Sequence, residues 1–162
     1  MQKKCLEPWV DDKTRILIVG TMPGEESLNQ QTYYANSRNK FWHYMAAILN
    51  NGQEVKTPKE RRLLLQSKGI GLWDSFSVCE RRGSLDSNIK KEQPNDFSKF
   101  QSVRYILFNG QKAAKYFKMY NRQYLEQREA FELPSTSPAN ASVPDDIKFE
   151  KWKTVLLSVV EK

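Results

Sequence analysis

The chain has 162 residues, which fits one domain at roughly 150 residues per domain, and its net charge of +7 favours a polyanionic partner such as nucleic acid or an anionic membrane surface. Its apolar runs are far shorter than the ~20 residues that span a bilayer, and its first residues lack the apolar region of a secretory signal. Two cysteines and one histidine exclude an iron–sulfur cluster, a four-cysteine zinc site and His-rich metal catalysis.

These limits describe a domain that works without a metal or cofactor. In the absence of a signal segment, Cys5 and Cys79 are expected to be free thiols, which indicates a reducing, cytoplasmic location. No repeat, low-complexity tract or linker divides the chain. Residues 1–162 are therefore expected to form a single domain, and this size suggests a monomer.

Strand and helix patterns alternate along the chain. Continuous apolar runs predict buried strands at residues 15–20 and 103–109, and weaker strands are expected at 71–78 and 128–133. A long polar loop, residues 20–38, follows the first of these strands. Helical spacing and end signals predict helices at about residues 39–50, 58–69, 110–120 and 145–161. The alternation implies a parallel sheet in a layered α/β fold, whose sites form beyond the carboxyl ends of the strands.

The first loop at such an end contains Gly20, Thr21 and Met22, followed by Pro-Gly. A turn of this kind after a buried strand can present backbone N–H groups to an anion or to the edge of a base. The segment lacks the Lys-Ser/Thr ending of a P-loop and the GxGxxG pattern. An ordinary tight exit from the strand explains the same residues.

The same loop continues through adjacent tyrosines to Asn39. Tyr33 and Tyr34 are suited to stacking on a flat ring. Asn39 is expected to point away from the apolar stripe of the following helix, toward whatever the loop encloses. The alternative is that Asn39 caps that helix. His43 lies one turn further on, where a solvated side chain is the simpler interpretation.

Two later segments offer polar groups at strand ends. The Asn109 carboxamide has one acceptor and two donors, enough to contact the edge of a heterocycle, although Asn-Gly also forms turns. The small polar loop at residues 133–141 is suited to a phosphate backbone, or is an ordinary connection. Asp74 is either a buried acid or a turn residue at the end of a strand.

In their order and spacing, these segments resemble the uracil-DNA glycosylase superfamily. Within it they resemble the hypoxanthine-DNA glycosylase (deoxyinosine glycosylase) family, which is related to the mismatch-specific uracil glycosylases. The segments are residues 20–24 (GTMPG), 33–42 (YYANSRNKFW), 69–74 (GIGLWD), 83–87 (GSLDS), 108–114 (FNGQKAA) and 133–137 (LPSTS). The resemblance implies a three-layer α/β/α fold with a central four-stranded, mostly parallel sheet. It also implies a monofunctional enzyme of base excision repair, which flips a deaminated base (hypoxanthine or uracil) out of DNA and hydrolyses its N-glycosidic bond.

The resemblance assigns roles to individual residues. Asn39 matches the residue that positions or activates water, Tyr34 the aromatic that stacks on the flipped base, and Asn109 the asparagine that contacts the edge of the base. Base contacts are also implied for Gly20, Thr21 and Met22, and DNA backbone contacts for Ser135, Thr136, Ser137, Pro138 and Asn140. Because Met22 stands where other branches have a catalytic Asp or Asn, the orientation of water falls to Asn39.

Two positions depart from the resemblance. Leu133 and Asn140 stand where relatives have, or often have, a histidine, so neutral donors must stabilise the leaving base. Together with Met22, these departures keep open the alternative of a catalytically weak or silent module that binds DNA lesions. A nucleoside hydrolase acting on small molecules is a weaker alternative, because it needs no basic surface.

Overall fold

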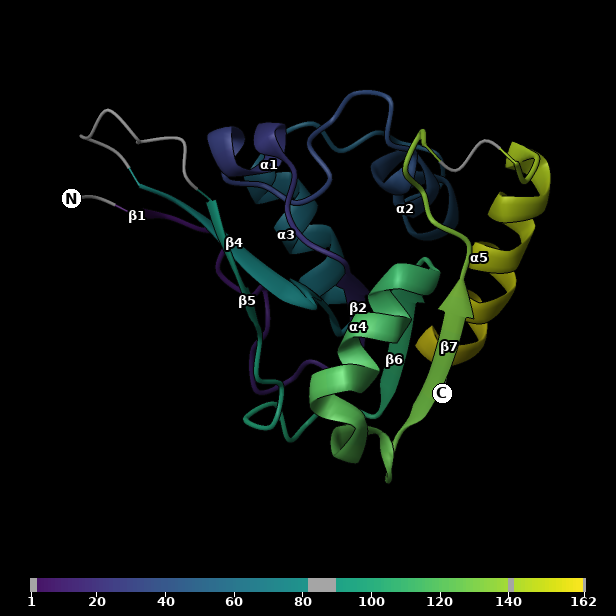
Figure 1. The fold of residues 1–162 in the computed structure, drawn as a ribbon. Coiled ribbons are helices and arrows are strands. Elements are labelled where there is room, and N and C mark those ends of the chain that lie inside the picture. Colours follow the sequence, from purple (N-terminus) through teal and green to yellow (C-terminus); the bar gives the residue numbers. More distant parts are fainter. Residues whose placement is uncertain (1–2, 82–89, 140–141, 162) are drawn as a thin grey trace.

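The computed structural model of the chain describes residues 3–81, 90–139 and 142–161. Its centre is a four-stranded sheet in the order β3-β2-β6-β7, and each neighbouring pair of strands is parallel. The strands are β2 (Ile16–Gly20), β3 (Ile70–Asp74), β6 (Tyr105–Asn109) and β7 (Glu129–Leu133). The prediction of a central four-stranded parallel sheet is confirmed (Figure 1).

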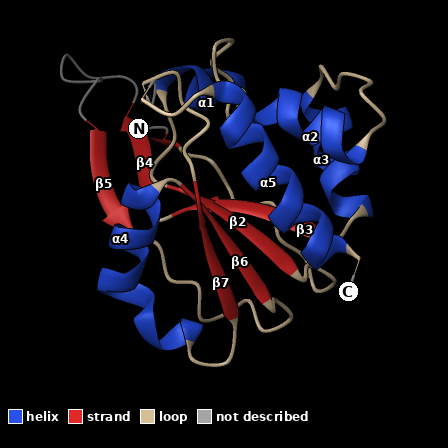
Figure 2. Cartoon of the chain, turned by 90° about the vertical axis from the view of Figure 1, so that its right-hand side faces the viewer, coloured by secondary structure: helices blue, strands red, loops and turns tan. Residues whose placement is uncertain are grey.

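Helices cover both faces of this sheet. One face is covered by α4 (Gln111–Asn121), and the other by α2 (Phe41–Leu49), α3 (Pro58–Ser67) and α5 (Asp145–Val160) (Figure 2). The three-layer architecture is therefore also confirmed, and these helices begin and end close to the predicted residues. The short helix α1 (Glu25–Gln30), which was not predicted, lies within the first loop, and the 3₁₀ helix η1 (Arg122–Leu125) follows α4.

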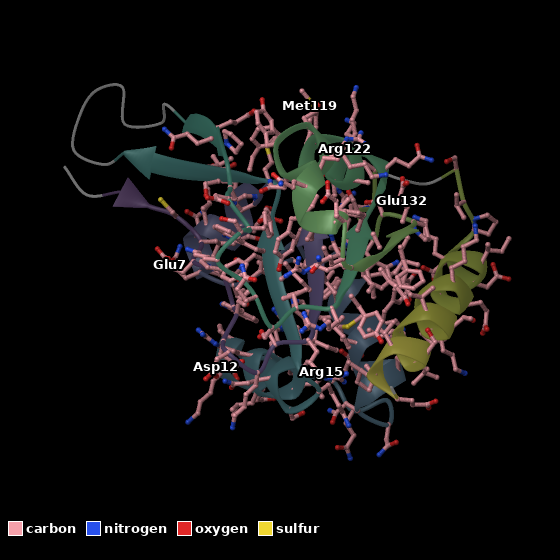
Figure 3. The ribbon with its side chains drawn as sticks, turned by 90° about the horizontal axis from the view of Figure 1, so that it is seen from below. Glu7, Asp12, Arg15, Met119, Arg122 and Glu132 are labelled. Carbon is pink, nitrogen blue, oxygen red and sulfur yellow. The ribbon has the colours of Figure 1, made fainter. Side chains whose placement is uncertain are left out.

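The core lies between the central sheet and these helices. All residues of β2 are buried, as expected for a strand covered on both faces. The largest side chains without exposed surface include Phe41, Phe108, Phe117 and Trp152, each of which contributes roughly 1.5–3 kcal/mol by burial. At the amino ends of the strands, Asp12 is exposed and Arg15 is half-buried, and Figure 3 shows this end of the molecule.

A second sheet was not predicted. The strands β1 (Lys3–Lys4), β4 (Phe76–Arg81) and β5 (Lys90–Pro94) form an antiparallel sheet in the order β1-β4-β5. The prediction of one strand at residues 71–78 is wrong, because the chain changes sheet at Ser75. The Ser75 N–H donates to the Gly20 carbonyl at 2.8 Å, and its hydroxyl donates to the Ala113 carbonyl at 2.9 Å.

The expectation of free thiols is also wrong. Cys5, which directly follows β1, is disulfide-bonded. The cytoplasmic location loses this support and stays a prediction. Across the described part of the chain, no helix is both long and apolar enough to cross a membrane.

Candidate active site

The carboxyl ends of the four parallel strands meet at one edge of the sheet. Gly20 at the end of β2 is in register with Asp74 at the end of β3, and Asn109 at the end of β6 with Leu133 at the end of β7. A cleft of about 1000 Å³ opens over these four residues. This volume is at the upper end of what small-molecule pockets occupy, so the cleft has room for a nucleotide.

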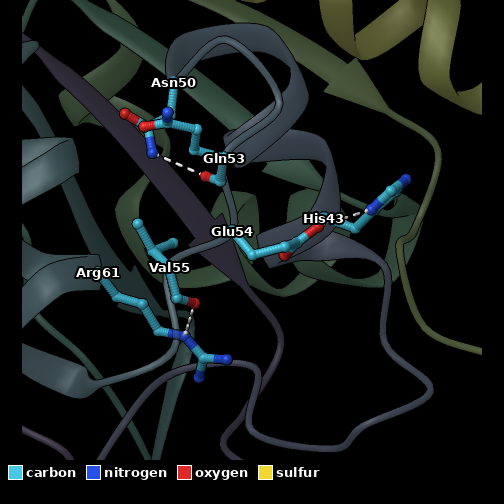
Figure 4. A network of polar contacts seen from close by, with 6 residues as sticks. All are labelled: His43, Asn50, Gln53, Glu54, Val55 and Arg61. Carbon is cyan, nitrogen blue, oxygen red and sulfur yellow. Dashed lines mark hydrogen bonds and ion pairs between the residues drawn. The ribbon is translucent and has the colours of Figure 1, made fainter.

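The cleft brings together nearly all of the candidate residues. It is lined by Gly20, Thr21, Met22, Tyr34, Asn39, Asn109, Ser135, Thr136, Ser137 and Pro138. Asn140 and the segment at residues 83–87 lie outside the described residues. His43 does not line the cleft. Its imidazole lies 3.1 Å from the Glu54 carboxylate, and both side chains are about half exposed (Figure 4).

Tyr34 is held in an unusual conformation beside the cleft. Its φ of 55° lies in the left-handed region, which side chains other than glycine rarely adopt. The ring stacks on Phe41, with 4.1 Å between the ring centroids and an interplanar angle of 28°. The hydroxyl is buried and has no hydrogen-bond partner among the described residues, and burial raises the pKa of Tyr34 far above its usual value. Tyr33, by contrast, belongs to the core and donates its hydroxyl to the Glu7 carbonyl at 2.6 Å.

Position 20, next to Tyr34, has room only for glycine. A Cβ atom at this position would lie 2.4 Å from Asp74 Oδ1 and 2.9 Å from the Tyr34 hydroxyl. Contacts between a Cβ and oxygen atoms at these distances are strongly repulsive. Because Gly20 has no side chain, the Asp74 carboxyl and the Tyr34 hydroxyl can both approach the place where a Cβ atom would stand.

Asn39 is not the N-cap of α2, as one interpretation of the sequence expected, because the N-cap is Lys40 and Asn39 precedes it. The backbone N–H of Phe41, the first residue of α2, donates to Asn39 Oδ1 at 3.0 Å, and the Asn39 N–H donates to the Asn36 carbonyl at 2.9 Å. The side chain thus satisfies one free N–H at the helix start, which fixes the orientation of its carboxamide. Asn39 also lines the cleft, so one residue both supports the start of the helix and borders the candidate site.

Asn109 is bonded to the loop that follows β7. Its Nδ2 donates to Thr136 Oγ1 at 3.0 Å, and its Oδ1 accepts the Thr136 N–H at 2.9 Å. The Lys40 N–H donates to the Thr136 carbonyl at 3.2 Å, so Thr136 joins this loop both to β6 and to the residue after Asn39. Both Asn109 and Thr136 are buried, whereas Pro138 is exposed.

Asp74 was left undecided by the sequence, and the structure shows it to be a buried acid. Its side chain lines the cleft with 4% of the residue exposed, and none of the described residues donates a hydrogen bond to its carboxyl group. Burial raises the pKa of Asp74 to about 7. The one sequence signal was its place at the end of a strand beside the Gly20 strand.

Charged groups border the cleft without forming a metal site. Lys112 and Lys151 line it together with Glu26 and Glu132. The Glu132 carboxylate forms an ion pair with the Lys118 ammonium group at 3.4 Å. In the described ranges, no group of three or more His, Cys, Asp or Glu side chains is arranged to hold a metal ion.

This fold and cleft define the class of protein. The chain belongs to the uracil DNA glycosylase superfamily, whose family model matches residues 7–158. The resemblance that the motifs indicated is thereby confirmed.

Individual relatives make the comparison more specific. The chain is 37% identical over 160 residues to a hypoxanthine DNA glycosylase of Methanosarcina acetivorans, with 96% of this chain and 98% of the relative covered. It is 34% identical over 120 residues to a hypoxanthine DNA glycosylase of Methanosarcina barkeri, with 72% and 76% covered. A solution NMR structure from M. acetivorans, provisionally described as a uracil DNA glycosylase, matches with a TM-score of 0.75 and 32% identity, over 99% of this chain and 100% of that one.

Proposed function

We propose that the chain is a monofunctional DNA glycosylase of base excision repair that removes hypoxanthine or uracil from DNA. The observation that carries this proposal is the convergence of Asn39 and Tyr34 on one cleft, in a member of the superfamily to which the relatives named hypoxanthine DNA glycosylase belong. In the reaction, water attacks C1′ of the extruded nucleotide while the bond from C1′ to the base breaks. The bonding electrons pass to the base, which takes up a proton, and an abasic site remains.

Tyr34 provides the surface on which the extruded base stacks. One face of its ring is supported by Phe41, so the ring is already fixed before the base arrives. Stacking on an aromatic side chain contributes roughly 1–3 kcal/mol per base, which offsets much of the cost of removing the base from the duplex. Gly20, Thr21 and Met22 complete the base pocket, where the missing side chain of Gly20 allows a close approach.

Asn39 positions the attacking water. Its Oδ1 accepts one hydrogen bond from the Phe41 N–H, and a carboxamide oxygen has a second acceptor site. A water molecule that donates to this site has its lone pairs free for C1′. The carboxamide does not rotate away, because the helix start holds it, and such preorganisation lowers the barrier.

The loop after β7 and two lysines hold the DNA backbone. Ser135, Ser137 and Pro138 line the cleft, and Thr136 supports them from inside through its bonds to Asn109. Lys112 and Lys151 lie on the same cleft and are placed to contact phosphates. One chain supplies all of these groups, which supports action as a monomer.

The alternative of a silent module that binds lesions is not favoured, because both curated relatives carry the name of an enzyme. Base release tests the proposal. Duplexes containing deoxyinosine or deoxyuridine are incubated with the wild type and Asn39→Ala, and alkaline scission reveals abasic sites. We expect release by the wild type and a loss of at least ~100-fold in Asn39→Ala, which corresponds to about 2.7 kcal/mol.

Asn50→Ala is the matched control, because Asn50 lies at the other end of α2 and donates only to the exposed Gln53 carbonyl (Figure 4). It should stay near the wild-type rate. If the wild type releases neither base while binding DNA, the protein is a binding module. If Asn39→Ala keeps full activity, another group positions the water.

A further inference from the structure

The Asp74 carboxyl group is the unexplained feature of the cleft. Two other acids near the site have partners: Asp145 accepts from the Tyr44 hydroxyl at 2.6 Å, and Glu132 pairs with Lys118. Asp74 is more buried than either, yet no described side chain or backbone N–H is bonded to its carboxyl group. Its carboxyl group borders the cleft, and a largely buried charge without a partner is unfavourable, so the neutral form is favoured.

The groups around Asp74 favour the neutral form. From the segment before α2, the Tyr34 hydroxyl lies near Asp74 at Gly20, and the Tyr33 hydroxyl is close enough for the two groups to influence each other's ionisation. Burial raises the pKa of both tyrosines, which keeps them uncharged. On β2 its neighbour is the uncharged Gly20, where a Cβ atom would lie 2.4 Å from Asp74 Oδ1. The charged side chains elsewhere on the cleft are Glu26, Glu132, Lys112 and Lys151, and none of them pairs with Asp74. With no cation beside it, burial alone acts on the carboxyl group and raises its pKa to about 7.

Resting on the proposed function, we propose that Asp74 contacts the extruded base and, in its neutral form, donates a hydrogen bond to the carbonyl oxygen that deamination has created. Hypoxanthine and uracil each carry a carbonyl group next to a ring N–H. A neutral carboxyl group presents an O–H donor next to a C=O acceptor, which matches that edge with two hydrogen bonds. A carboxylate has no donor and repels the carbonyl oxygen.

The same contact acts on the reaction itself. As the bond to C1′ breaks, negative charge accumulates on the departing base. A neutral donor at its carbonyl oxygen stabilises this charge, whereas a carboxylate at the same place opposes it. This supplies the neutral donor that the absence of a histidine at Leu133 requires. Asn109 is held by its two bonds to Thr136, which fix its carboxamide and leave one N–H of Nδ2 outside those bonds.

The proposed contact makes the rate of base release depend on pH. Ionisation of Asp74 removes the donor, so base release falls as pH rises through the pKa of the group, near 7. Asp74→Asn keeps a donor next to an acceptor but does not titrate. The variant should therefore lose the alkaline decline and retain most of the activity seen at lower pH.

The test is single-turnover release of hypoxanthine from a deoxyinosine duplex between about pH 5.5 and 8.5. The wild-type rate should fall ~10-fold or more from pH 7 to 8.5, whereas Asp74→Asn should vary less than ~3-fold and exceed the wild type at the alkaline end. Asp12→Asn is the matched control, because Asp12 is exposed at the opposite end of the sheet, and it should keep the wild-type decline (Figure 3).

Each failure has its own meaning. If Asp74→Asn declines with pH as the wild type does, or if the wild-type rate is flat, Asp74 does not act as a neutral donor. If the wild type releases no base at any pH, the proposed function fails instead. Should Asp74→Asn not fold, a carboxyl ¹³C NMR titration of the wild type decides: a midpoint near 7 for Asp74 supports the proposal, and an ordinary midpoint near 4 overturns it.

Discussion

The ends of β3 and β6 differ in what their polar side chains do. Asp74 and Asn109 close two strands that flank β2, line the same cleft and are almost equally buried, at 4% and 6% exposed. The Asn109 carboxamide makes two hydrogen bonds to Thr136, whereas no described residue forms a hydrogen bond with the Asp74 carboxyl. One strand end thus holds a loop of the cleft in place, whereas the polar group at the other has no partner among the described residues.

The largest expected effect is that of Asp74→Asn on the free energy of unfolding. The pKa of Asp74 is about 7 in the folded chain, against 3.8 for an ordinary aspartate. Only the unfolded chain loses this proton between those values, so the free energy of unfolding falls as pH rises from about 4 to 7. Asp74→Asn removes that loss and should be more stable than the wild type by on the order of 4 kcal/mol at pH 8. Urea unfolding at pH 5 and 8 measures this, and identical pH dependence in the two proteins would refute it.

Asn109→Ala should act in the opposite direction. It removes both bonds to Thr136 and leaves the buried Thr136 N–H without a partner, which should lower the unfolding free energy by ~2–4 kcal/mol. Asn36→Ala is the control, because its side chain accepts only an exposed bond from the Arg38 N–H. Urea unfolding of both variants decides. A cost for Asn109→Ala no larger than for Asn36→Ala would mean that Asn109 does not hold the loop.

Gly20→Ala tests whether the site needs the space beside the Asp74 carboxyl and the Tyr34 hydroxyl. The new Cβ displaces the Asp74 carboxyl and the Tyr34 hydroxyl, so we expect base release to fall by ~100-fold, about 2.7 kcal/mol. Gly24→Ala is matched in kind and in the same loop, but its Cβ would meet no atom within 4 Å. Single-turnover rates of both variants give the comparison. Equal rates in the two would show that the site tolerates a side chain below Tyr34.

The smallest effect is expected at the rim of the cleft. Replacing Lys112 and Lys151 with Gln should leave chemistry at saturating enzyme almost unchanged. It should weaken DNA binding and reduce the slope of log K against log salt by about 2. Lys118→Gln is the control, because Lys118 pairs with Glu132 and does not line the cleft. Binding titrations at several salt concentrations measure the slopes, and an unchanged slope in the double variant would exclude both phosphate contacts.

Much of the fold was predictable from local pattern. The apolar strands β2 and β6 and the main helices follow from runs and spacing that each segment carries by itself. The second sheet was not predictable in this way. Its strand β5 (KKEQP) consists of residues that are poor strand formers and is defined by pairing with β4. Likewise, the break at Ser75 depends on bonds to Gly20 and Ala113, which are distant in sequence.

The location of the candidate site was predictable from the sequence, but the different roles of its residues were not. The rule for strand ends located the loops that line the cleft. It did not distinguish Asp74 from Asn109, because the difference lies in partners. The bonds from Asn109 go to a residue 27 positions away, and the isolation of Asp74 is a property of packing that no local pattern records.

The most direct test of the account is the crystal structure of Asn39→Ala bound to a duplex that contains deoxyinosine. The variant should bind the substrate without cleaving it. The account predicts hypoxanthine in the cleft, stacked on Tyr34, with its carbonyl oxygen within hydrogen-bond distance of the Asp74 carboxyl. A base that remains in the duplex, or whose edge contacts Asn109 instead, would contradict it.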